Sequence, residues 1–160
     1  MIELLIVVSI IGIVAGIAVP SLLSARAAAN ETSAIGSLRA VWSGQATYST
    51  VCGWGGYATS LPVLAVSPGG IGAPFLSPDL TAGATISKGG FNVTLNNGGS
   101  PAFFPDCNGT PTTAEYYASA TPIDVGVTGS RSFAVDQVGV IYFAPGASAP
   151  NPASAGTPIQ

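Results

Sequence analysis

The stretch Ile2-Glu-Leu-Leu-Ile-Val-Val-Ser-Ile-Ile-Gly-Ile-Val-Ala-Gly-Ile-Ala-Val-Pro20 decides the architecture of this 160-residue chain. From Leu4 to Leu23 no side chain carries a charge. Twenty helical residues rise about 30 Å, which is roughly the hydrocarbon thickness of a bilayer. The sequence therefore predicts that residues 1–23 form a helix suited to a membrane or to another apolar surrounding.

The charged side chain nearest to this apolar run is Glu3. A carboxylate is costly to bury in lipid unless it finds a partner. A plain signal anchor carries Lys or Arg before its apolar core, and neither precedes Leu4 here. We therefore interpret the first residues as a processed N-terminus and Glu3 as a candidate functional residue.

Three segments of this stretch, Ile2–Val8, Ile10–Ile13 and Ile17–Pro20, resemble the N-terminal signature of the type IV pilin and pseudopilin family. The interval from Glu3 to Pro20 also matches the family interval. The resemblance is dense and specific over residues 1–25 and concerns the helix only. One departure is that Met1 alone precedes Ile2, where the family has Phe-Thr and one further residue, so the alignment predicts two more residues in front.

The resemblance implies an α+β pilin fold, in which a long N-terminal helix packs on a small antiparallel β-sheet head. It also implies a homopolymer, most like a type IV major pilin, whose subunits form a helical filament. The subunit would reside in the bacterial inner membrane before assembly and in an extracellular pilus afterwards. A prepilin peptidase, a methylation step and the pilus assembly machinery would act on it. Cell adhesion, motility or DNA uptake would be properties of the whole filament.

Within the helix, the resemblance implies that Glu3 pairs with the N-terminal amine of a neighbouring subunit during assembly. The pairing is physically reasonable, because removal of one buried charge leaves the other without a partner. The remaining subunit contacts are expected from apolar side chains of the first three turns, namely Leu4, Leu5, Val7, Val8 and Ile11.

Gly12, Gly16 and Pro20 are three weak points of this helix. Proline removes one backbone hydrogen bond and clashes with the preceding turn, and glycine adds backbone freedom. One interpretation is a kink whose glycines allow close helix packing in lipid. The other comes from the family, in which the segment between Gly12 and Pro20 loses helicity in assembled filaments. We favour the second interpretation, for the filament only.

The composition argues against several other functions. Only 7% of the residues are charged, the net charge is −3 and histidine is absent. A basic patch for nucleic acid is not expected from four cations, which are Arg26, Arg39, Lys88 and Arg131. Without histidine, and with scattered carboxylates, the sequence predicts no enzyme, no metal site and no cofactor. Low charge with 48% hydrophobic residues favours a surface covered by neighbours.

Cys52 and Cys107 are the two cysteines, 55 positions apart. That spacing does not fit a zinc site. If the head lies outside the cytoplasm, a disulfide is the natural interpretation, and closing such a loop stabilises a fold by roughly 4 kcal/mol. The alternative is a pair of buried free thiols.

Residues 24–51 are expected to continue the helix as an amphipathic half that packs on the head. Small or apolar residues recur at helical spacing, with Gln45 as the exception, at positions 28, 35, 38, 41, 42 and 48. The opposite face carries Asn30, Ser33, Ser37 and Ser43. The glycine-rich segment 52–56 ends the helix. Trp42, Tyr48, Trp54 and Tyr57 are expected to pack at the junction of helix and head.

The head is expected to span residues 52–143, beginning with a proline-punctuated loop at 53–82. Alternation predicts a strand at 91–96, with residues 84–87 as its partner across a tight turn. Another strand is expected at 115–120, and a hairpin at 132–136 and 139–143. Residues 144–160 are rich in Pro, Ala, Ser and Gly without charge and are expected to form a weakly structured tail.

Two alternatives remain beside the pilin interpretation. The first is a pseudopilin of a type II secretion system, whose head often holds calcium in a C-terminal loop. The sequence has no acidic cluster near its C-terminus, which argues against it. The second is a membrane-anchored periplasmic binding module that never polymerises. The low charge and the Glu3-to-Pro20 match argue against that one.

Overall fold

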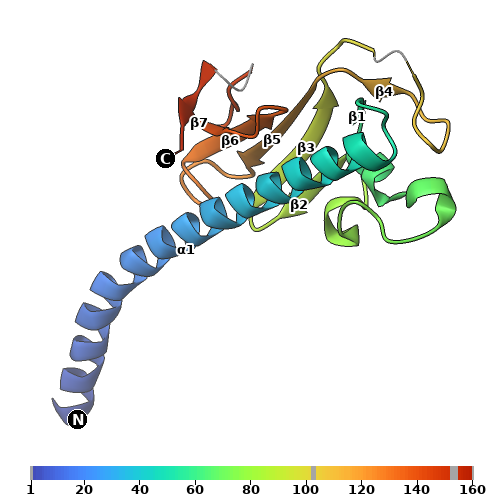
Figure 1. Ribbon diagram of the computed structural model, residues 1–160. Helices are drawn as coiled ribbons and strands as arrows, with labels where there is room; N and C mark the ends of the chain where they lie inside the picture. The colour runs from blue at the N-terminus through green and yellow to red at the C-terminus, as the bar shows by residue number, and fades with distance from the viewer. Residues whose placement is uncertain (1, 102–103, 152–154, 160) are drawn as a thin grey trace.

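The computed structural model describes residues 2–101, 104–151 and 155–159. A single helix, α1 (Ile2–Val51), leads into a head built on an antiparallel sheet, which confirms the α+β class (Figure 1). The first half of α1 extends away from the head and curves, and its second half lies across one face of the sheet (Figure 1). The helix runs unbroken through Gly12, Gly16 and Pro20. Melting of this segment in a filament stays a prediction.

The main sheet has six strands in the order β2-β3-β5-β6-β7-β8, and every neighbouring pair is antiparallel. A separate two-stranded ribbon pairs β1 with β4 near the C-terminal end of α1 (Figure 1). The strand bounds are β1 (Tyr57–Ala58), β2 (Thr85–Lys88), β3 (Phe91–Asn97), β4 (Thr112–Thr113), β5 (Tyr116–Pro122), β6 (Arg131–Asp136), β7 (Ile141–Pro145) and β8 (Thr157–Pro158).

Local sequence explains most of these strands. Phe91, Val93 and Leu95 are buried while their neighbours are more exposed, as the alternation in β3 predicts. Gly89 and Gly90 both have positive φ, which allows the tight turn between β2 and β3. The hairpin of β6 and β7 is also present, with a turn of four residues rather than two.

The core lies between the second half of α1 and the sheet, and it is closed by a short 3-10 helix, η1 (Leu61–Ala65). Leu38, Val41 and Tyr48 of the helix are fully buried, as are Phe91 and Phe133 of the sheet. The buried stripe differs from the expected one, because Ala28 and Trp42 are exposed and Ser37 is buried. The hydroxyl of Ser37 donates to the carbonyl of Ser33, which satisfies it within the helix.

The proline-punctuated loop contains more local structure than expected, with η1 joined by η2 (Pro68–Gly70) and η3 (Pro78–Leu80). In each of these one-turn helices a proline lies at the start, where its missing N–H costs nothing. The tail expected to be weakly structured also has more structure than predicted. Thr157–Pro158 pairs with Tyr142 and Phe143 as the edge strand β8, and the hydroxyl of Tyr117 donates to the carbonyl of Pro150.

Candidate assembly interface and its attachment to the head

The N-terminal half of α1 is an apolar surface without intramolecular cover. Every residue from Ile2 to Arg26 is exposed, and the most apolar window has a mean hydropathy of 2.8. By length and composition, α1 is able to cross a membrane. Contiguous apolar surface of this size on a folded protein indicates contact with lipid or with another protein.

The residues expected to mediate assembly all lie on this surface. At 3.6 residues per turn, Leu4, Val7, Val8 and Ile11 fall on one side of the helix, with Leu5 and Glu3 at the two margins. Each of these side chains is exposed, and Glu3 lies in the first turn of α1. The structure therefore places them next to one another along the helix but brings none of them into contact with the head.

Glycines 12 and 16 contribute to the same surface. A side-chain carbon added at either position would meet nothing within 4 Å. Both positions are therefore open, as the approach of another helix requires. Farther along, beside Pro20, a shallow apolar hollow is lined by Ala18, Val19, Ser21, Leu22 and Ala25.

The exposed segment ends where α1 reaches the head, and a buried carboxylate marks that point. Glu31 is 6% exposed, and its Oε1 accepts hydrogen bonds from the backbone N–H and the hydroxyl of Ser130. Its Oε2 accepts two from Arg131, at 3.0 Å from Nε and 2.6 Å from Nη2. Burial alone would raise the pKa of Glu31, but the hydrogen bonds from Arg131 and Ser130 outweigh it and lower that pKa.

Arg131 is held from its other side by aromatic rings. Its guanidinium carbon lies 5.1 Å from the ring centroid of Phe143 and 5.7 Å from that of Phe133. Sequence analysis missed this cluster. The available signal was the position of Glu31, seven residues before Leu38 and so on the buried stripe, where an isolated charge requires a partner.

Gln45 forms a second attachment, between the middle of the buried stripe and β1. Its side chain is fully buried, and its amide pairs with the backbone of Ala58 in both directions. Nε2 donates to the Ala58 carbonyl at 2.9 Å, and the Ala58 N–H donates to Oε1 at 2.8 Å. Gln45, the one polar residue in the expected apolar stripe, therefore makes the two backbone hydrogen bonds to Ala58 that a neighbouring strand would otherwise make.

The third attachment is at the C-terminal end of α1. Cys52 and Cys107 form the expected disulfide, with their Cα atoms 4.9 Å apart. Beside it, the hydroxyl of Tyr48 donates to Oδ2 of buried Asp106 at 2.7 Å. Burial, together with this hydrogen bond to a carboxylate, raises the pKa of Tyr48. Oδ1 of Asp106 accepts from the backbone N–H groups of Asn108 and Thr110, which fixes the segment that carries Cys107.

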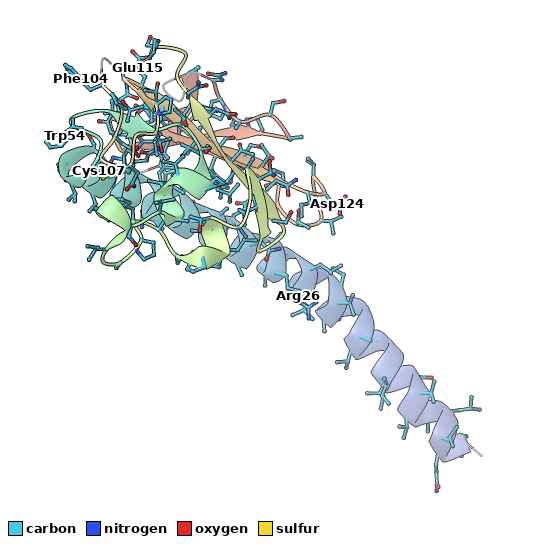
Figure 2. The ribbon with its side chains drawn as sticks, turned by 90° about the vertical axis from the view of Figure 1, so that its right-hand side faces the viewer. Arg26, Trp54, Phe104, Cys107, Glu115 and Asp124 are labelled. Carbon is cyan, nitrogen blue, oxygen red and sulfur yellow. A yellow bond between two sulfur atoms is a disulfide. The ribbon has the colours of Figure 1, made fainter. Side chains whose placement is uncertain are left out.

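Of the four aromatic residues expected at the junction, Tyr48 and Tyr57 pack within the protein, whereas Trp42 and Trp54 are exposed, Trp42 by 39%. Tyr48 is buried, and the ring of Tyr57 packs edge-on against that of Tyr116 at 4.9 Å. The expectation for Trp54 is wrong, because 73% of this residue is exposed. Its φ is 51°, a conformation that bulky residues rarely adopt, and the turn that follows α1 presents its ring to the outside (Figure 2).

The potential metal ligands of the described part of the chain are its Asp, Glu and Cys side chains. No group of three or more Asp, Glu or Cys side chains gathers there in a way that would hold a metal ion. Comparisons with protein-family models, with curated proteins and with solved structures gave no match. The assignment of function therefore depends on the chemistry of this chain and on the resemblance of its first residues.

Proposed function

We propose that this protein is a structural subunit, a pilin, that polymerises through its N-terminal apolar helix into an extracellular helical filament. The observation that carries the proposal is the contrast between the two halves of α1. The second half packs one face against a head that closes its own core, whereas residues 2–23 of the first half are largely apolar, exposed and free of charge except for Glu3. A folded protein with such a helix requires cover, which lipid supplies before assembly and other copies supply in a filament.

In this proposal the filament core is built from residues 2–23, and Glu3 pairs with the N-terminal amine of a neighbouring subunit. The heads lie outside the core. Because apolar side chains point in every direction around this part of α1, each copy is able to contact several neighbours at once. The inner membrane, the prepilin peptidase and the assembly machinery are the partners that the pilin proposal implies.

The experiment is electron cryo-microscopy of filaments sheared from cells that produce this chain. We expect a helical fibre with residues 2–23 in its core and with the segment from Gly12 to Pro20 extended rather than helical. A chain that stays in the membrane fraction and is absent from every sheared filament contradicts the proposal. That result favours the secretion pseudopilin or the anchored module.

A substitution provides a second test. Glu3→Ala should reduce the filament yield by roughly tenfold or more, because it removes a charge pair from an apolar core. The thermal unfolding of the head should not change, since Glu3 contacts nothing in the head. The matched control is Asp79→Ala, which removes an exposed carboxylate from the head, outside every proposed contact, and leaves the helix core intact. Normal yield from Glu3→Ala would show that Glu3 has no role in assembly.

A further inference from the structure

The end of the head that is farthest from the N-terminus exposes a pair of aromatic side chains. Trp54 and Phe104 are 73% and 68% exposed, and with Pro105 and Asp106 they line an open hollow of about 540 Å³ (Figure 2). Backbone hydrogen bonds from Gly55 to Ser49 and from Gly56 to Gly53 hold the turn that carries Trp54. The exposure of Trp54 is therefore a feature of an ordered turn.

The opposite end of the head, where α1 emerges, exposes aliphatic side chains. They belong to the connection between β5 and β6, in which Ile123, Val125 and Val127 are all exposed. This connection is also ordered. The Asp124 carbonyl accepts hydrogen bonds from the N–H groups of Val127 and Thr128, and Gly126 donates to Gly129.

The two ends differ in the charges that lack an ion pair. Of the four basic side chains, Lys88 pairs with Asp79 and Arg131 pairs with Glu31. Arg26 and Arg39 are both exposed on α1, Arg26 just below the head, and neither has an ion pair among the described residues. Glu115 is exposed at the far end, near Phe104 and Trp54, and also has none (Figure 2). The far end thus combines aromatics with the acid Glu115, and the near end combines aliphatics with the base Arg26 and the acid Asp124.

We propose that the far end of one head contacts the near end of the head of a second copy of this chain. Trp54 and Phe104 pack on Val125 and Val127 of that copy, and Glu115 pairs with its Arg26. The inference rests on the proposed function and adds the head contact to the helix core. Two different patches on one subunit form a heterologous contact, which repeats without closing and generates an open helical filament. The apolar patches supply the attraction, and the charge pair sets the register.

Asp124 provides the competing explanation, because it also lies exposed at the near end (Figure 2). If Arg26 served only to neutralise Asp124 of its own subunit, no second copy would be involved. The two possibilities predict different rescue patterns when charges are exchanged.

The first test measures the yield of sheared filaments from charge-exchange variants. Arg26→Glu and Glu115→Arg should each reduce the yield by roughly tenfold, because each places like charges at the contact. The double variant should restore it, and Arg26→Glu combined with Asp124→Arg should not. Restoration by Asp124→Arg, or full yield from either single variant, overturns the inference. Thermal unfolding of each full-length variant in detergent verifies that the head is folded.

The second test removes an aromatic side chain without strain. Trp54→Asn suits the positive φ at this position, since asparagine tolerates it. The matched control is Ile71→Asn, which changes a residue that is 83% exposed outside both end patches. The yield should fall for Trp54→Asn and not for Ile71→Asn. Equal yields from the two variants overturn the inference.

The outcomes separate this inference from the proposed function. If the unmodified chain forms filaments that Glu3→Ala abolishes, while the head variants assemble normally, only the head contact is wrong. If the unmodified chain forms no filament at all, the proposed function fails, and the contact between heads fails with it.

Discussion

Arg131, the first residue of β6, donates two hydrogen bonds to one carboxylate oxygen of Glu31, one hundred positions earlier on α1. The other oxygen accepts hydrogen bonds from the backbone N–H and the hydroxyl of Ser130. This ion pair marks the boundary between the exposed and the buried halves of the helix. It therefore fixes the point at which the apolar segment leaves the head, and so the direction in which that segment is presented.

Substitution Glu31→Gln should lower the free energy of unfolding by about 2 kcal/mol. The amide keeps the shape but loses the ion pair, and it leaves Arg131 partly buried without a counter-charge. Urea denaturation of the full chain in detergent measures the effect, with Glu115→Gln as a control that should change stability by less than about 0.5 kcal/mol. Identical midpoints for Glu31→Gln and the unmodified chain would exclude a stabilising role for the pair.

The same pair predicts the acid response of the protein. Because the pKa of Glu31 in the folded state lies below its ordinary value of 4.5, the unfolded chain binds this proton more readily. The stabilisation is therefore complete above about pH 4.5 and decreases as the pH falls through the lowered pKa of the folded state. The midpoint difference between the unmodified chain and Glu31→Gln should shrink over that range. A difference that stays constant down to the acid limit of folding would contradict this assignment.

Gln45→Leu should destabilise the protein by about 3 kcal/mol although it makes the stripe more apolar. Leucine leaves the N–H and the carbonyl of Ala58 buried without partners, and each such loss costs about 1 to 3 kcal/mol. The measurement is again urea denaturation, compared with Gln137→Leu at an exposed position in the turn between β6 and β7. A stabilised Gln45→Leu variant would mean that water or a shifted strand satisfies Ala58.

Removal of the disulfide by the double substitution Cys52→Ala and Cys107→Ala should cost about 4 kcal/mol, from the chain entropy regained by the loop. The loss should be local at first, because Tyr48 still holds Asp106 through a hydrogen bond. Hydrogen exchange should show faster exchange in residues 104–113 and unchanged protection in β3 and β5. Uniform loss of protection across the sheet would instead indicate that the bridge supports the whole head.

Regular local patterns in the sequence predicted much of this fold. The run of uncharged residues predicted α1. The alternation of apolar and polar residues predicted β3, in which Phe91, Val93 and Leu95 are buried on one face of the sheet. The disulfide between Cys52 and Cys107 was predicted because the chain has two cysteines and because its apolar segment indicated a head outside the cytoplasm. In each case the signal lies within a short window or in a residue type that has few alternatives.

Contacts between distant residues were not predictable in the same way. The partner of Glu31 lies one hundred residues away, and no periodicity connects the two. The strand β8 consists of two residues whose pairing depends on the shape of the chain before it. Trp54 was expected to pack at the junction of helix and head, but the backbone conformation of a single turn directs it outward. The assembly role of Glu3 depends on other copies, which one chain does not contain.

The disulfide between Cys52 and Cys107 has a mechanical consequence. A filament under tension would load each subunit through α1 at one end and through its head contacts at the other. The covalent bridge joins the end of α1 directly to Cys107, so tension that passes from α1 to head residues beyond Cys107 bypasses residues 53–106. Strands β2 and β3 lie inside this bypassed loop, whereas β5, β6 and β7 lie outside it. Under that part of the load, extension would begin in the chain after Cys107, which includes β5, while β1 and η1 stay within the bypassed loop.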